Sequence, residues 1–266
     1  MRYFRLFSFA LIFVILFSAA SWSGIYILAN QESQMGKMIT KVFAENDRIR
    51  IESSGMMQNM IIIFRGDKQL FWMINTNDNT YYEMTKQDME KISSKMDEAT
   101  EMMKQNMTPE QYEMMQKYMK GKMPEQEKQE TVYNKKESGV KINKWKCTHY
   151  EGIEGGKKVS DVWTASWQEL GFTKEDFDVF KELSKFSESF SKNQKSGFMM
   201  YGEQEEKSPF DGFPVRTIDY DRGNNQQTFN IEEIKKQNNK SSLFDLPSGV
   251  EKVDQQMGKM PGGIEY

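Results

Sequence analysis

The sequence has few of the residues on which catalysis and covalent cross-linking most often depend. Its 266 residues include one cysteine, Cys147, and one histidine, His149. A single cysteine excludes an intrachain disulfide, so the folded chain depends on its core alone. The sequence contains no Gly-x-Ser-x-Gly elbow, zinc-ligand spacing or phosphate-binding loop. These absences favour a protein that is not an enzyme and that holds no cofactor or metal.

The sequence also lacks an excess of basic residues. With 36 Lys and Arg against 39 Asp and Glu, the net charge is −3, which argues against a nucleic-acid-binding protein. The charged fraction of 28% and the hydrophobic fraction of 38% are those of an ordinary folded protein. The length is sufficient for one domain with a sizeable core.

Cys147 and His149 form the only Cys-His pair that the sequence offers as nucleophile and base. In an extended segment over residues 145–150 they share a face with Trp145, because side chains alternate along a strand. A tryptophan on that face indicates a buried surface, where cysteine acts as a small hydrophobic residue. We therefore expect Cys147 to belong to the core and not to act as a nucleophile.

The N-terminus has the pattern of a secretion signal. Arg2 and Arg5 precede an uncharged run from Leu6 to Ala20, and small residues follow. The apolar run is about 15 residues long, which is shorter than the roughly 20 residues of a spanning helix. Cleavage is therefore favoured over an uncleaved anchor.

Cleavage is expected after Ala20, with Ser23 as the alternative. Residues 1–20 are then a signal peptide, residues 21–254 a single domain and residues 255–266 a flexible tail. The mature chain is expected in the periplasm, with no membrane-spanning segment left after cleavage.

The first half of the mature chain has the pattern of an antiparallel sheet. Residues 48–52 alternate between polar and apolar types, and the apolar runs 60–64 and 70–74 are separated by the turn formers of 65–68. Strands joined by such short connections are antiparallel, because a parallel crossover needs a dozen or more residues. Further strands are expected at 24–30, 80–84, 131–133, 140–142, 145–150, 159–167, 213–220 and 227–231.

Two helical insertions are expected, near residues 85–120 and 173–192. Thr85 with Asp88, and Thr108 with Gln111, are pairs that can cap a helix start. Methionine follows in the first insertion, and phenylalanine in the second, at spacings of three and four. We assign the chain to the α+β class, with a large curved antiparallel sheet of about nine to ten strands and helices covering its concave side.

The 21 methionines allow three interpretations. Thioether sulfur suits Cu(I), and Met102, Met103 and Met107 have ligand-like spacing. The methionine stripes are also typical of buried helix faces. The third interpretation is an apolar cavity between helices and sheet, because Met-rich surfaces adapt to partners of variable shape, such as acyl chains. The residues expected to line that cavity are Met89, Met96, Met103, Met115, Met119, Phe180, Phe186, Trp72 and Trp163.

The order of several short segments is similar to that of a known family. After the signal come RIRIE at 48–52, MIIIF at 60–64, LFWMI at 70–74, TYYEM at 80–84, WKC at 145–147, VWTA at 162–165 and LFDLPSGV at 243–250. This order resembles an uncharacterised bacterial family of exported proteins, a domain of unknown function. That family in turn is similar to the periplasmic carriers of outer-membrane lipoproteins, and is in this sense LolA/LolB-like.

The resemblance implies a half-open β-barrel with helices over its open side and an apolar cavity between them. It also implies binding of lipid or a lipidated partner without catalysis. In the carriers an arginine inside the cavity helps to hold the helical lid shut. Arg48, Arg50 and Arg65 are the candidates here, and no motif selects one of them.

We expect an exported, non-catalytic binding or carrier protein for an apolar ligand, such as lipid or lipoprotein acyl chains. One alternative is a structural, envelope-associated protein with a filled core and no small ligand. The other is a methionine-based Cu(I) binder.

Overall fold

The computed structural model describes residues 24–34, 36–55, 59–108, 110–112, 114, 131–188, 210–220 and 226–253. The expected signal peptide and the expected tail lie outside the described residues. These two expectations stay predictions.

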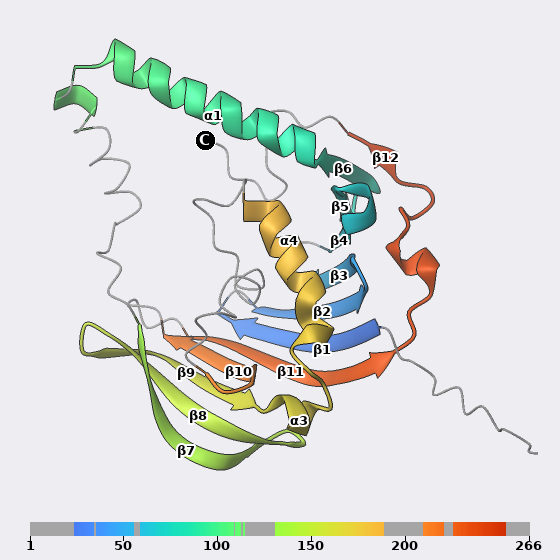
Figure 1. Ribbon diagram of the computed structural model, residues 1–266, viewed down its shortest axis with the longest axis vertical. Coiled ribbons are helices and arrows are strands. Elements are labelled where there is room, and N and C mark those ends of the chain that lie inside the picture. The colour runs from blue at the N-terminus through green and yellow to red at the C-terminus, as the bar shows by residue number, and fades with distance from the viewer. Residues whose placement is uncertain are drawn as a thin grey trace, which may run out of the picture.

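The described chain is built around one twelve-stranded sheet with the order β12-β6-β5-β4-β3-β2-β1-β11-β10-β9-β8-β7 (Figure 1). Neighbouring strands are antiparallel except β12, which runs parallel to β6. The strands are β1 Gly24–Ser33, β2 Gly36–Glu45, β3 Arg48–Gly55, β4 Met60–Arg65, β5 Leu70–Asn75, β6 Thr80–Thr85, β7 Val132–Ile142, β8 Trp145–Glu154, β9 Lys157–Ala165, β10 Phe213–Tyr220, β11 Gln226–Gln237 and β12 Glu251–Lys252.

The α+β class and the antiparallel hairpins of the sequence analysis are confirmed, and the strand number is corrected from about nine to ten to twelve. The two segments expected at 131–133 and 140–142 are one strand, β7, because register shifts near Glu137 and Gly139 absorb what looked like a break. The strands β2 and β12 were not expected. β12 has only two residues, and its place depends on hydrogen bonds to the edge of β6.

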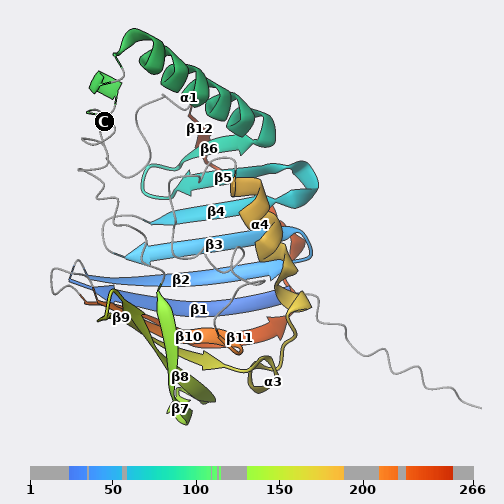
Figure 2. The same cartoon turned by 60° about the vertical axis from the view of Figure 1, so that its left-hand side comes forward.

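The sheet is open, because its order begins at β12 and ends at β7 and the two ends do not pair with each other. It is strongly curled, so that β7, β8 and β9 turn away from the plane of β3 to β6 (Figures 1 and 2). The protein is therefore mostly β, with an open sheet and not a closed barrel.

Among the described residues, the helices with full bounds are α1 Lys86–Asn106, α3 Trp167–Leu170, α4 Asp178–Glu188 and the short 3-10 turns η1 Gly66–Lys68, η2 Glu175–Phe177 and η4 Ser241–Phe244. The predicted capping box at the start of α1 is confirmed, with Thr85 Oγ1 accepting from the Asp88 N–H and Asp88 accepting from the Thr85 N–H. Within the described ranges, no helix is both long and apolar enough to cross a membrane.

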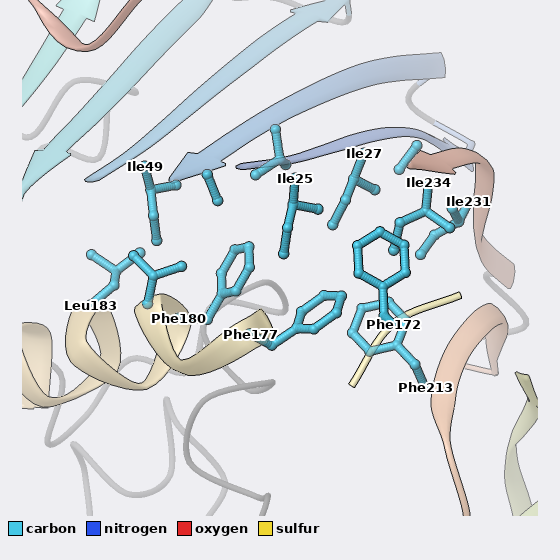
Figure 3. Close-up of a cluster of buried hydrophobic side chains, with 14 of the residues drawn as sticks. Ile25, Ile27, Ile49, Phe172, Phe177, Phe180, Leu183, Phe213, Ile231 and Ile234 are labelled. Carbon is cyan, nitrogen blue, oxygen red and sulfur yellow. The ribbon is translucent and has the colours of Figure 1, made fainter. Parts of the chain in front are cut away.

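Two apolar clusters lie on opposite faces of the sheet, since Phe64 belongs to one and its neighbour Ile63 to the other. We call the first the helix-side cluster. In it Phe177, Phe180 and Leu183 face the isoleucines of β1, β3 and β11 (Figure 3). The second is the strap-side cluster, which the C-terminal segment 240–253 covers. We call that segment the strap.

Candidate functional site

The helix α4 is docked firmly on the sheet. Phe186 packs on Phe64 and Phe71, with ring centroids 5.3 and 6.0 Å apart, and all three belong to or border the helix-side cluster. At the other end, Asp176 in η2 pairs with Lys236 of β11 at 2.8 Å. Phe180 and Phe186, two of the expected cavity residues, are therefore buried between α4 and the sheet.

A second row of side chains on the same face is less covered. Strand pairing places Ile234, Ile27, Val42, Ile51, Ile62, Met73 and Tyr82 directly opposite one another across seven strands. The first three are at most 3% exposed, whereas the last four are only half-buried. We call Ile51, Ile62, Met73 and Tyr82 the apolar row.

The apolar row is bordered by a row of mostly polar side chains, which Met60 interrupts. The next row along the strands, two residues further on, holds Thr40, Ser53, Met60, Asn75 and Thr80. On the other side lies the row of Ile49, Phe64, Phe71 and Met84, which α4 and the start of α1 help to bury. The apolar row is thus continuous with the core on one side and bordered by mostly polar side chains on the other.

The methionines of α1 divide into a buried start and an exposed continuation. Met89 is 1% exposed and belongs to the helix-side cluster, whereas Met102 is 57% exposed. Met114, beyond α1, is 69% exposed, so neither Met102 nor Met114 lies on a buried helix face. The side chains of Met96, Met103, Met115 and Met119 lie outside the described residues. The views show α1 running along the β6 end of the sheet and then beyond it (Figures 1 and 2).

Trp72 lies on the face opposite to Phe180 and Phe186. It is 7% exposed in the strap-side cluster and donates from Nε1 to Glu83 Oε2 at 2.8 Å. The expectation that it lines the same surface as the α4 phenylalanines therefore differs from the observed arrangement. The sequence could not show this, because β5 carries apolar side chains on both of its faces.

The three candidate arginines also lie on the strap side, and they hold the strap. Arg50 donates to the Leu243 carbonyl oxygen and Arg65 to the Phe244 carbonyl oxygen, each at 3.1 Å. The guanidinium of Arg48 stands 4.8 Å from the Phe244 ring centroid. In the described chain these arginines bind the C-terminal segment and do not contact a helix of the opposite face.

Trp163 takes part in a stack at the curled end of the sheet. Its ring lies parallel to that of His149, with centroids 4.6 Å apart, and the Arg216 guanidinium stands 5.2 Å from its centroid. His149 Nε2 in turn lies 2.7 Å from Asp161 Oδ1. Sequence reasoning did not find Asp161 or Arg216, because their neighbours in space come from other strands.

Asp161 is the most heavily bonded carboxylate of this cluster. Burial opposes its ionisation, but hydrogen bonds from Lys158, Tyr220 and His149 outweigh burial and lower the pKa of Asp161. Burial, together with the bond to Asp161, raises the pKa of Tyr220. The cluster therefore holds Asp161 in its charged form.

Cys147 and His149 do not form a nucleophile and base pair in this arrangement. The Cys147 thiol is 1% exposed and contacts the Trp145 carbonyl oxygen, and His149 is engaged with Asp161. Burial raises the pKa of the Cys147 thiol to about 11. Across the described segments, no three His, Cys, Asp or Glu side chains come together as metal ligands would.

The fold defines the chain as an open-sheet α+β protein of mostly antiparallel strands. It belongs to the family DUF4412, a domain of unknown function, which matches residues 83–250. No curated protein matches the chain. Among solved structures it is similar to an uncharacterised conserved protein from Thermus thermophilus, at 9% identity and a TM-score of 0.42, over 88% of this chain and 91% of that one. These matches do not confirm the expected relation to the lipoprotein carriers.

Proposed function

We propose that this protein is an exported, non-catalytic binding or carrier protein for an apolar ligand, an acyl chain of a lipid or of a lipidated partner. The proposal is carried by the half-buried apolar row of Ile51, Ile62, Met73 and Tyr82. It crosses four neighbouring strands, which at the usual strand spacing is a length of about 14 Å.

The form of this surface suits an extended apolar chain. The row is one residue wide, is continuous with the helix-side cluster along one side, and is flanked along the other side by Thr40, Ser53 and Asn75. An acyl chain lying along it would remove apolar surface from water, and a polar head group could reach the flanking polar side chains. In this proposal α4 closes one side of the site and α1 covers the other. The exposed Met102 would supply adaptable contacts.

The periplasmic location and the signal peptide belong to the same proposal, as does the likeness to the lipoprotein carriers. Support comes from the charge-free run of residues 6–20 and from the open sheet with α4 docked on one face. The alternative, a structural protein without a ligand, is favoured by the close packing of α4 at Phe64 and Phe71.

The deciding experiment is native mass spectrometry of protein purified without detergent, followed by titration with a fluorescent fatty acid. The variant Ile62→Lys places a charge in the apolar row and should weaken fatty-acid binding at least about tenfold, because a charged group is costly to bury. Ile39→Lys is the matched control, since Ile39 is 40% exposed and lies on the opposite face.

Where Ile62→Lys does not fold, Met73→Gln tests the same row more gently, and circular dichroism decides which variant is used. Equal binding by the Ile62 and Ile39 variants would move the site away from this row. If the protein carries no co-purified lipid and shows no saturable fatty-acid binding, the structural alternative is the one that remains.

A further inference from the structure

We propose that Arg216 is an anion-binding residue, which takes the carboxylate or phosphate group of a small ligand beside the His149–Trp163 stack. This site lies at the curled end of the sheet and does not rest on the proposed function of the apolar row.

Arg216 has a fixed place on an inner strand near the curled end of the sheet. It lies on β10 directly opposite Trp163 of β9 and Asn230 of β11. The register of β10 and β9 shifts between Pro214 and Arg216, and such bulges redirect a side chain and recur beside functional sites. The Trp163 ring, 5.2 Å from the guanidinium carbon, orients the flat guanidinium group, because an arginine stacks on an aromatic face.

The other cations around this stack are already paired with carboxylates. Lys158 bonds Asp161 at 2.8 Å and Glu151 at 3.2 Å, and Lys136 bonds Glu151 at 2.9 Å. His149 bonds the remaining oxygen of Asp161. Asp161 thus accepts from Lys158, Tyr220 and His149 together, which leaves it little capacity for a further donor.

Arg216 differs from these cations. Its Nε atom is buried without a hydrogen-bond partner, and no carboxylate of the described residues forms an ion pair with its guanidinium. The Arg216 residue as a whole is half-buried, but a buried N–H donor without an acceptor is costly. An anionic ligand would supply both the acceptor and the opposite charge.

The geometry of the guanidinium selects the ligand class. Nε and one Nη atom form a planar fork that matches two oxygens of a carboxylate or a phosphate. Because the fork lies against Trp163, an anion bound in its plane would lie beside the indole ring. Arg48 offers a comparison, since it also stacks on an aromatic ring but has a carboxylate partner, Glu45, at 3.6 Å.

The test uses the full chain and reads the Trp163 indole N–H signal by two-dimensional NMR. That signal is identified as the one lost in Trp163→Phe. We expect it to shift saturably when inorganic phosphate or butyrate is added, in a constant excess of chloride. Arg216→Gln should weaken binding about tenfold or more, in keeping with the loss of charge-assisted hydrogen bonds.

Two further variants keep the test decisive. Arg216→Lys keeps the positive charge at this position but loses the planar pair of N–H donors. It should therefore bind the anion more weakly than the wild type does. Arg48→Gln should leave anion binding unchanged. If the indole signal saturates with phosphate and not with butyrate, the ligand bears a phosphate group. If it saturates with butyrate and not with phosphate, the ligand bears a carboxylate. A shift that does not saturate, or one of equal size in Arg216→Gln, overturns the proposal.

Discussion

Arg65 of β4 donates from Nη1 to the carbonyl oxygen of Phe244, 179 residues further along the chain, at 3.1 Å. The same guanidinium bonds both oxygens of Asp67 and reaches Asp245 Oδ1. Arg65 itself is 7% exposed, and Phe244 is fully buried over Ile63 and Ile74. The first sheet half and the strap are therefore joined by a nearly buried cation at the border of an apolar cluster.

Replacing Arg65 should loosen the strap. Arg65→Ala removes the donor to the Phe244 carbonyl oxygen and leaves Asp67 without its cation. We expect a loss of about 2–3 kcal/mol in the free energy of unfolding, because hydrogen bonds to charged groups are involved. Urea denaturation measures it, and limited proteolysis should show faster cleavage within residues 240–253.

Lys37→Ala is the control for this change. Lys37 and Glu32 form an ion pair whose side chains are both more than half exposed. Such pairs contribute about 0.5 kcal/mol or less, so the variant should unfold nearly like the wild type. If Arg65→Ala were as mild as Lys37→Ala, the strap would be held by the Phe244 side chain and not by the arginine.

Acid should weaken the Asp161 cluster in a defined direction. Hydrogen bonds lower the pKa of Asp161 in the folded chain, so its stabilising effect is present above the unfolded value of about 3.9 and is lost as the pH falls through the folded value. Asp161→Asn should therefore cost about 2 kcal/mol at pH 7. Urea midpoints at pH 7 and pH 3 should show the two proteins converging at the lower pH.

A constant difference between wild type and Asp161→Asn from pH 7 to pH 3 would contradict this assignment. It would mean that the shape of the side chain, and not its charge, supports Lys158 and Tyr220. Tyr220→Phe separates the two, because it removes one donor to Asp161 and leaves the ring in place.

Much of the fold could be predicted because local signals determine it. The Thr85–Asp88 capping box forms as its spacing predicts, and so do the hydrogen bonds between Thr108 and Gln111. The hairpin of β4 and β5 follows from two apolar runs and a short turn. β2 was missed, since its polar positions, such as Lys37 and Lys41, interrupt the kind of apolar run by which β4 and β5 were found.

The candidate sites could be predicted only in part, because they depend on register and on which face a strand presents. Helical spacing put Phe180 and Phe186 on one apolar face, where they were expected to line a cavity, and the structure buries both in the helix-side cluster. Trp72 gave no sign of its face. Arg216 could not be linked to Trp163, because that pairing depends on a bulge between distant strands.

Cys147 should be unreactive in the folded protein. Burial raises the pKa of its thiol to about 11, and the side chain is 1% exposed. Since the thiolate is the reactive form, alkylation at pH 8 should be at least about 100-fold slower than in the unfolded chain. Mass spectrometry after iodoacetamide treatment, with and without urea, measures the ratio. Rapid labelling without urea would show that β8 opens at this residue.

The methionines of α1 should differ in their rate of oxidation. Met102 is 57% exposed, whereas Met89 is 1% and Met84 is 2% exposed. Because sulfoxide formation follows exposure, peroxide should oxidise Met102 about tenfold faster than either buried methionine. Peptide mapping at several times gives the three rates.

Oxidation of the chain in urea is the control, since all three methionines should then react alike. A sulfoxide is polar, so its formation at Met89 would place a polar group in the helix-side cluster beside Met84 and Phe64. Should Met89 react as fast as Met102 in the folded protein, the first turns of α1 would not be docked on β6. The start of α1 would then not be anchored to the sheet, and α1 could not form the proposed cover over the apolar row.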